Sequence, residues 1–323
     1  MKDPNQFPRI PLGLLPTPMH RLDNISRLLG KNVYIKRDDL TGIGLGGNKV
    51  RKLEFLLAEA RAQGADTVLT TGGAQSNHAM LTAACAGRLG MKAILVLKKR
   101  GVTDKKGNQA LNDLLGAEVR FVDTDDYADV YAEMERIGAD LAARGHRCYN
   151  IPVGGSVPLG SLGYVKGMRE LALQAAEMGF QPDRIVCAVG SGGTHAGVAL
   201  GARLFLPGTK VTGVAVDTDP FEEIVPALIR GVAGLLELEL PEDAQRVELR
   251  DMTGPGYAVP SLKGNAAVRL MAEKEGIFLD PVYTGKAFAG LVDLCREGAF
   301  DGEENIVFLH TGGAGGLFAR EIQ

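Results

Sequence analysis

Along the chain, short apolar runs alternate with longer stretches in which apolar residues recur at helical spacing. The runs predict strands at residues 32–36, 67–71, 93–97, 119–122, 184–189, 210–216 and 306–310. The helical spacing predicts helices at residues 48–64, 77–89, 109–115 and 127–144. The first of these helices has an apolar face, formed by Val50, Leu53, Leu56, Leu57 and Ala60. Strands that alternate with helices in this way predict an α/β fold with mostly parallel sheets.

Three of the predicted strands run into a polar, glycine-rich loop that is followed by a helix. These segments are TVLTTGGAQSNHAMLTAA at 67–84, RIVCAVGSGGTHAGVALGA at 184–202 and IVFLHTGGAGGLFARE at 306–321. Ligands of open α/β sheets bind at the carboxyl ends of the strands, where such loops lie. The three loops can therefore converge on one ligand.

Length and composition narrow the class of protein. A chain of 323 residues favours two domains or two lobes, and 45% apolar with 23% charged residues is typical of a soluble globular protein. No apolar stretch approaches the roughly 18 residues of a membrane-spanning helix. With 36 basic and 39 acidic residues and no basic stripe, neither nucleic acid nor an anionic membrane is an expected partner. The first residues lack the apolar segment of a signal peptide, so we expect a cytoplasmic protein.

Several common kinds of site find no support in the sequence. The cysteines are scattered and lack a CxxC pair, which predicts buried, reduced thiols at Cys85, Cys148, Cys187 and Cys295. No histidine lies in an HExxH motif or near a cysteine pair, so we expect no metal site. A GxSxG motif is also missing, which argues against a serine hydrolase of that type.

Glycine is over-represented, with 43 residues gathered in loops. The best candidate for a phosphate-binding loop is the run Gly190, Ser191, Gly192, Gly193 and Thr194. There, backbone N–H groups and the start of a helix favour an anion, although a tight turn without a ligand explains the same residues equally well. The dinucleotide motif GxGxxG fails because His195 replaces its third glycine. Asp217, after the next strand, still keeps a nicotinamide enzyme as an alternative.

The most unusual local feature is a lysine in a glycine-rich loop. Lys49 directly follows Gly46, Gly47 and Asn48 at the start of a predicted helix, where the helix dipole disfavours a cation. A solvated lysine is one explanation, since charge effects at the surface are small. The alternative is a lysine that is neutral in its working form, for example as a Schiff base with an aldehyde cofactor.

Eight motifs in order connect this lysine to a known family. They are IKRDDLTG from Ile35, GGNKVRKLEF from Gly46, QSNH from Gln75, IPVGGS from Ile151, GSGGTHAG from Gly190, PGYAVP from Pro255, LDPVYTGKAFAGL from Leu279 and HTGG from His310. Together they resemble the D-cysteine desulfhydrase and 1-aminocyclopropane-1-carboxylate deaminase family of pyridoxal-phosphate enzymes. This family has the tryptophan-synthase-β fold, also called fold type II.

The resemblance implies two lobes, each an open, mostly parallel sheet flanked by helices, with pyridoxal 5′-phosphate between them. The large cofactor-binding lobe would comprise residues 1–47 and 158–323, and residues 48–157 would form the smaller, inserted lobe. It further implies a homodimer that acts on a small amino acid.

The resemblance also assigns a role to individual residues. It makes Lys49 the lysine that binds the cofactor covalently and Lys52, one helical turn later, a residue that holds its phosphate. Gly190, Ser191, Gly192, Gly193 and Thr194 match the family's phosphate loop. Asn77 matches the asparagine that bonds the 3′-oxygen of pyridoxal, while Ser76, Asn77 and His78 open the helix that grips the substrate carboxylate. The two tyrosines that face the substrate correspond to Tyr257 and Tyr283.

Two threonines bear on the choice of substrate. The cyclopropane deaminases carry Glu at the position of Thr284 and an apolar residue at that of Thr311, whereas the desulfhydrases match this chain. We expect Thr311 nearest the pyridine nitrogen, with Thr284 close by. Met80 departs from many relatives, which have arginine there.

The resemblance therefore implies β-elimination, with D-cysteine as the expected substrate. L-cysteine and L-cysteate remain nearer alternatives within the family. Cyclopropane deamination and a nicotinamide enzyme are more distant ones.

Overall fold

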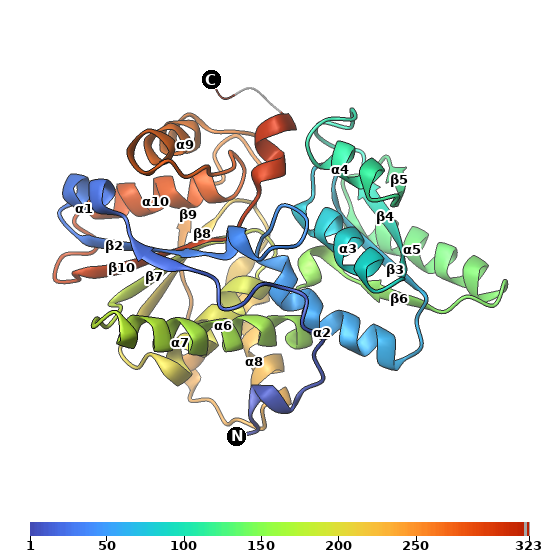
Figure 1. Cartoon of the computed structure of the whole chain (residues 1–323), viewed down its shortest axis with the longest axis horizontal. Helices are drawn as coiled ribbons and strands as arrows, with labels where there is room; N and C mark the ends of the chain where they lie inside the picture. The colour runs from blue at the N-terminus through green and yellow to red at the C-terminus, as the bar shows by residue number, and fades with distance from the viewer. Residues whose placement is uncertain (320–321, 323) are drawn as a thin grey trace.

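The computed structural model describes residues 1–319 and residue 322, and it contains two open sheets with helices packed against them (Figure 1). The larger sheet has the strand order β1-β2-β10-β7-β8-β9. Its strands are β1 (Met19–Arg21), β2 (Asn32–Arg37), β7 (Arg184–Val189), β8 (Lys210–Ala215), β9 (Glu248–Asp251) and β10 (Asn305–His310). All neighbouring strands pair in parallel except β1, which is antiparallel to β2.

The smaller sheet has the order β5-β4-β3-β6 and is parallel throughout. Its strands are β3 (Thr67–Gly73), β4 (Lys92–Lys98), β5 (Glu118–Val122) and β6 (Cys148–Ile151). The predicted α/β class with mostly parallel sheets is confirmed. All four strands fall within residues 48–157, and we keep that range as the proposed extent of the smaller lobe.

Ten α-helices are present in the described part of the chain. They are α1 (Asp23–Leu29), α2 (Lys49–Ala62), α3 (Asn77–Arg88), α4 (Asn108–Leu114), α5 (Tyr127–Ala142), α6 (Pro158–Glu177), α7 (Gly193–Phe205), α8 (Phe221–Leu235), α9 (Leu262–Glu275) and α10 (Thr284–Arg296). Short 3₁₀ helices are η1 (Pro4–Gln6), η2 (Asp38–Leu40), η3 (Val153–Gly155), η4 (Glu242–Gln245) and η5 (Ala314–Ala319). Residues 320 and 321, which end the third strand–loop segment of the sequence, lie outside the described residues.

Every strand and helix that the hydrophobic pattern predicts by range is present, with ends that differ by a few residues. The pattern gave no range for the three short strands β1, β6 and β9. Each has only three or four residues and includes exposed positions, so it lacks the apolar run that marks a buried strand.

Helix α2 lies between the two sheets (Figure 1). Its predicted apolar face packs in one buried cluster with Val68 of β3 and Leu81 of α3. Phe55, on another face, is buried against the large lobe, where it contacts a cluster that includes Leu162 of α6 and Val232 of α8. Because both faces are covered, the polar residues of α2 are buried as well and need partners inside the protein.

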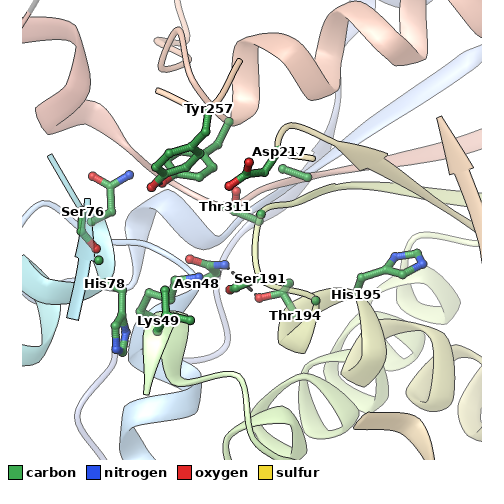
Figure 2. Close-up of a pocket in the computed structure, with 18 of the residues that line it drawn as sticks. Asn48, Lys49, Ser76, His78, Ser191, Thr194, His195, Asp217, Tyr257 and Thr311 are labelled. Atoms are coloured by element: carbon green, nitrogen blue, oxygen red, sulfur yellow. Dashed lines mark hydrogen bonds between the residues drawn. The ribbon is translucent and has the colours of Figure 1, made fainter. Parts of the chain in front are cut away.

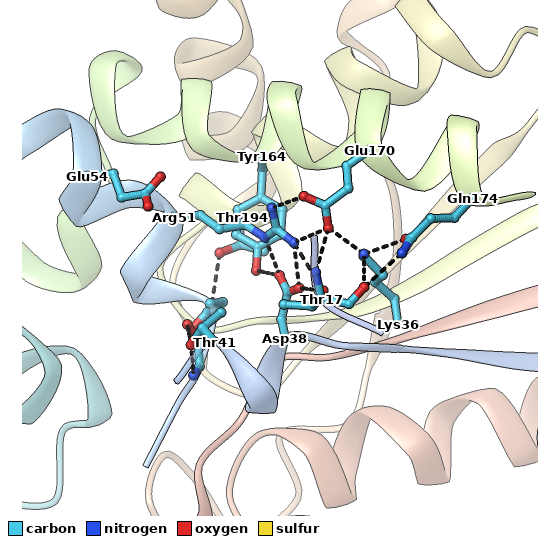
Figure 3. Close-up of polar contacts among 12 residues, drawn as sticks. Thr17, Lys36, Asp38, Thr41, Arg51, Glu54, Tyr164, Glu170, Gln174 and Thr194 are labelled. Carbon is cyan, nitrogen blue, oxygen red and sulfur yellow. Dashed lines mark hydrogen bonds and ion pairs between the residues drawn. The ribbon is translucent and has the colours of Figure 1, made fainter. Parts of the chain in front are cut away.

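Arg51 and its partners form a polar network between α2 and α6 (Figure 3). The Arg51 guanidinium donates to both carboxylate oxygens of Asp38, at 2.8 and 2.9 Å, and to both of Glu170, at 2.8 and 3.0 Å. The Tyr164 hydroxyl donates to Asp38 at 2.6 Å. Lys36 donates to Glu170 at 2.5 Å, so each carboxylate meets more than one donor.

This network joins η2, α2, α6 and the N-terminal segment, since Thr17 also donates its hydroxyl to Asp38 at 2.7 Å. Burial by itself would raise the pKa of Asp38. The charge and hydrogen bonds of Arg51 outweigh burial and lower that pKa to about 2. The start of α2, where Lys49 lies, is thus fixed to the large lobe by a largely buried charged cluster.

The cysteines form no disulfide. Cys85 and Cys187 are buried as expected, but Cys148 and Cys295 are partly exposed because they lie at the start of edge strand β6 and in the last turn of α10. In the described residues, no helix combines the length and apolar character needed to cross a membrane. Nor does that part of the chain group three or more His, Cys, Asp or Glu side chains into a possible metal site.

We predict that Arg51→Met destabilises the protein by about 3–5 kcal/mol, because it leaves the fully buried carboxylate of Asp38 and the partly buried one of Glu170 without their shared cation. Urea unfolding of the apoprotein measures the change. Arg136→Met is the matched control, since Arg136 makes comparable ion pairs with Glu133 and Asp140 on the exposed face of α5. That control should cost less than about 1 kcal/mol. Equal losses for the two variants would contradict a stabilising role for the network.

Candidate active site

A pocket lies between the two sheets, at the carboxyl ends of β3, β7 and β10 (Figure 2). All three glycine-rich loops predicted from the sequence contribute to its wall. The loop after β3 supplies Ser76 and Asn77, the loop after β10 supplies Thr311, and the loop after β7 supplies Gly190, Ser191, Gly192 and Thr194. Their predicted convergence is confirmed.

Lys49 enters this pocket from the first position of α2, because the preceding turn folds tightly against the loop after β10. Gly47 forms an isolated bridge with Gly312, and the Asn48 amide donates to the carbonyl of Thr311 at 3.0 Å. Gly47 has φ 140°, and a Cβ atom there would lie 3.1 Å from the Thr311 oxygen. At Gly46, with φ 74°, a Cβ would overlap the Asp39 carbonyl at 1.8 Å. Only glycine fits both positions.

The environment of the Lys49 amine favours its neutral form. No carboxylate among the described residues pairs with Lys49, and burial lowers its pKa to about 8. A lysine with this pKa is partly unprotonated near neutral pH. It can therefore act as a nucleophile toward a carbonyl group or as a base.

Lys52, one turn further along α2, is buried beside the loop after β7. Its amine donates to the Gly154 carbonyl at 2.9 Å and to the Ser156 hydroxyl at 3.1 Å. Burial, followed by repulsion from Lys49, lowers the pKa of Lys52 well below its ordinary value. Within the described part of the chain, no carboxylate compensates this cation. A phosphate group bound beside it would supply the missing negative charge.

The loop after β7 provides the rest of an anion site. The Gly193 amide donates to the Ser156 hydroxyl at 3.2 Å, and that hydroxyl lies 2.9 Å from the Ser191 hydroxyl. A Cβ at Gly193 would come 2.8 Å from the Ser156 Cα, so glycine is required there. Helix α7 begins at this residue and directs its positive end toward the loop. These residues fit a phosphate that carries two negative charges.

Opposite this loop, the start of α3 presents Ser76 and Asn77 to the pocket. Ser76 is the N-cap, and its side-chain oxygen accepts from the Ala79 amide at 3.2 Å. His78 also borders the pocket, but its Nε2 lies 2.8 Å from the Thr70 hydroxyl. Burial, followed by the charges of Lys49 and Lys52, lowers the pKa of His78 well below its usual range. Its ring is therefore neutral and held by β3.

Tyr257 and Tyr283 close another side of the pocket. Their hydroxyl oxygens are 2.5 Å apart and the rings meet edge to face. Burial raises the pKa of Tyr257 to about 12 and that of Tyr283 well above 10, so both phenols keep their protons. The backbone next to each ring is glycine: a Cβ at Gly73 or Gly190 would lie 3.2 or 3.1 Å from a tyrosine carbon.

The two threonines have different surroundings. Thr311 lines the pocket, whereas Thr284 is fully buried and is not among the lining residues. The Thr284 hydroxyl donates to Asp280 at 2.7 Å and accepts from the Asp280 amide at 2.8 Å. Met80 is likewise outside the lining residues, because its side chain packs in the core of the small lobe.

Some functional positions were missed from the sequence, because they are assembled only by the fold. Asn48 donates its side-chain amide to the Thr194 hydroxyl at 2.9 Å and so ties the lysine turn to the phosphate loop. Tyr127 and Asp219 also line the pocket. Asp217 lies beside Tyr257 (Figure 2). The one signal in the sequence was that Asp217 closely follows a parallel strand, since ligand sites lie at the carboxyl ends of such strands.

Fold and site together suit an enzyme that uses an aldehyde cofactor with a phosphate group. A family model described as pyridoxal-phosphate dependent enzyme matches residues 10–312, and the chain belongs to this family. Its cofactor is accordingly pyridoxal 5′-phosphate, and the nicotinamide interpretation of the loop after β7 is excluded.

Relatives resolve the family more finely. The chain is 43% identical to a D-cysteine desulfhydrase of Salmonella choleraesuis (strain SC-B67), over 97% of this chain and 96% of the relative. It is 42% identical to a Pyrococcus abyssi protein named "Putative 1-aminocyclopropane-1-carboxylate deaminase", over 97% and 94%. A solved structure described as an ACC deaminase homologue superposes with TM-score 0.91 at 43% identity, covering 97% of this chain and 94% of the other. The chain is thus a pyridoxal-phosphate enzyme of the desulfhydrase and deaminase group.

We predict that Lys49 carries the cofactor. Reduction of the holoprotein with borohydride and peptide mapping should place the pyridoxyl group on Lys49, and Lys49→Ala should abolish turnover while the phosphate still binds. A label on Lys36, Lys52, Lys166 or Lys286 instead would reject this assignment.

Lys52→Met should weaken the affinity of the apoprotein for pyridoxal 5′-phosphate about 10- to 150-fold, the range expected for a lost hydrogen bond to a charged group. Equilibrium titration measures the dissociation constant. Pyridoxal, which lacks the phosphate, is the internal control and should bind equally well to both proteins. A matching loss of pyridoxal affinity would show that Lys52 does not act through the phosphate.

Proposed function

We propose that the chain is a carbon–sulfur lyase that converts D-cysteine and water to pyruvate, ammonia and hydrogen sulfide. The observation on which this proposal rests is that Thr311 lies in the wall of the pocket. The resemblance implies that the pyridine nitrogen binds next to this residue. The 43% identity to a protein named D-cysteine desulfhydrase supports the same substrate. From the resemblance alone, we also propose a cytoplasmic homodimer.

The pocket can bind an amino acid in a defined orientation. Backbone N–H groups at the start of α3, with Ser76 as N-cap, offer a site for the α-carboxylate on the side opposite the phosphate loop. Lys49 enters between the two and can therefore reach the α-carbon. Its pKa of about 8 suits a base that removes the Cα proton near neutral pH.

Pyridoxal phosphate, when bound, supplies the electron sink that makes this proton acidic. The residues of the chain manage the protons and the leaving group. As the Cβ–S bond breaks, the electron pair of the broken Cα–H bond forms the new double bond and sulfide departs. The paired hydroxyls of Tyr257 and Tyr283 can supply the proton that sulfide takes up. Water then hydrolyses the released aminoacrylate to pyruvate and ammonia.

A neutral group at the pyridine nitrogen suits this elimination. A carboxylate there would favour the protonated ring, because an opposite charge stabilises a cation. Opening a cyclopropane ring gains from that stronger electron sink, whereas elimination of sulfide has a leaving group that takes the negative charge. The nearby carboxylate of Asp280 does not fill this role, since its two oxygens accept from three backbone amides and the Thr284 hydroxyl.

The acidic residues that line the pocket favour a neutral β-substituent over a sulfonate. Asp217 and Asp219 are both lining residues. Lys49 is the only lysine or arginine that lines this pocket among the described residues, and it is engaged in the chemistry. L-cysteate would place a second anion in these surroundings, so we propose it as the weaker substrate.

The proposal predicts that D-cysteine yields sulfide and pyruvate in equal amounts and faster than L-cysteine, with L-cysteate poorer still. The cyclopropane amino acid should give no 2-oxo acid. Product assays with each compound test this order, and Lys49→Ala controls for non-enzymatic release by free cofactor. Faster turnover of L-cysteine, L-cysteate or the cyclopropane substrate would reassign the enzyme within its group without affecting the cofactor.

A further inference from the structure

Asn108, the first residue of α4, is fully buried and lies outside the residues that line the pocket. Its side-chain amide nevertheless contacts two residues at the loop after β3. Its Nδ2 donates to the carbonyl of Gln75 at 2.8 Å and to Oδ1 of Asn77 at 2.7 Å. Asn77 is a lining residue, so Asn108 stands directly behind the pocket wall.

These bonds fix the orientation of both amides. A backbone carbonyl can only accept, so the atom of Asn108 that faces the Gln75 oxygen must be the NH₂ nitrogen. That nitrogen has a second hydrogen, which is directed to Asn77. The atom of Asn77 that meets it must then be the carbonyl oxygen. The NH₂ group of Asn77 is consequently turned away from Asn108 and left for the pocket.

Further contacts prevent Asn108 from rotating. The Asn108 backbone amide donates to Gln75 Oε1 at 2.8 Å, and Gln75 Nε2 donates to the carbonyls of Val102 and Lys106 at 2.9 and 3.1 Å. On its other side, Asn108 packs against the backbone of η5. A Cβ at Gly315 would lie 2.1 Å from Asn108 Oδ1, so the Asn108 amide packs directly against this glycine. A reversed amide would set two oxygens against each other at Gln75.

We infer that Asn108 is a positioning residue that makes Asn77 a hydrogen-bond donor toward the pyridoxal ring. The inference rests on the assigned contact between Asn77 and the 3′-oxygen, and it is independent of which amino acid is the substrate. A donor at this oxygen favours its charged form. A carbonyl oxygen in the same place would repel that charge and favour the protonated form. Asn108 thereby sets the ionisation of the bound cofactor without touching it.

Asn108→Asp provides the sharpest test, because a carboxylate repels the Gln75 carbonyl and the Asn77 oxygen and so reverses the Asn77 amide. We expect the pH midpoint of the cofactor absorption band, measured without substrate, to rise by at least about one unit. The dissociation constant for pyridoxal 5′-phosphate should increase about tenfold or more, as for a lost bond to a charged oxygen. Asn108→Ala, which only releases Asn77, should shift both quantities in the same direction by less.

Asn112 supplies the matched control on the same helix. It is equally buried, and neither side-chain polar atom has a hydrogen-bond partner among the described residues. Asn112→Asp should therefore lower the stability of the apoprotein, measured by urea unfolding, yet leave the absorption midpoint unchanged. Equal midpoints for the two aspartate variants would overturn the inference.

A double-mutant cycle shows whether the effect passes through Asn77. In an Asn77→Ala background, Asn108→Asp or Asn108→Ala should cause no further shift of the midpoint. The full shift in that background would mean that Asn108 acts by another route and would equally reject the inference. Should Asn108→Asp not fold, the alanine variant completes the cycle.

Discussion

Arg51 holds the start of α2 in place, and the geometry of the site depends on it. Helix α2 is covered on both sides, so its cations need partners inside the protein. Arg51 finds them in Asp38, which begins η2 directly after β2, and in Glu170 on α6. Lys49 and Lys52 belong to the same helix, so the contacts that fix the helix also fix these two lysines. An ion-paired arginine thus places two lysines that have no carboxylate partner among the described residues.

Those two lysines explain why the pocket suits a phosphorylated aldehyde. Burial lowers the pKa of both amines, and the charge of Lys49 lowers that of Lys52 further. The loop after β7 offers backbone donors beside Lys52 but no negative charge of its own. Binding of a dianion there removes the cost of the Lys52 charge, while Lys49 keeps a low pKa for chemistry. The protein thus supplies two buried amines without a counter-ion in the described part of the chain, and the phosphate of the cofactor supplies the negative charge beside one of them.

Much of this was predictable from the sequence because it is local. The alternating pattern predicted the fold class, the glycine clusters indicated the three loops, and the position of Lys49 at a helix start marked it as unusual. What escaped prediction joins residues far apart in the chain. Arg51 meets Glu170, and Asn108 meets Asn77, only through the packing of separate elements. The spacing of apolar and polar residues along the chain does not predict contacts between such distant residues.

Thr284 illustrates a different limit. Its sequence context predicts a place near the pyridine nitrogen, but one residue type can act directly or through a neighbour. In the fold its hydroxyl is bonded to Asp280, which also accepts the amide of Tyr283. The distinction depends on which way a single side chain turns at the start of α10. A motif records the position but not that rotation.

The contact between Gly47 and Gly312 has a consequence for how this chain can diverge. A Cβ at Gly312 would lie 2.7 Å from the Gly47 Cα, and one at Gly47 would crowd the Thr311 oxygen. Neither clash is relieved by shrinking the other residue, because each is already the smallest. A larger residue at one position therefore cannot be compensated by a smaller residue at the other. Neither glycine can therefore be replaced by random mutation. New substrate specificities must arise instead from the side chains around this contact between the two backbones.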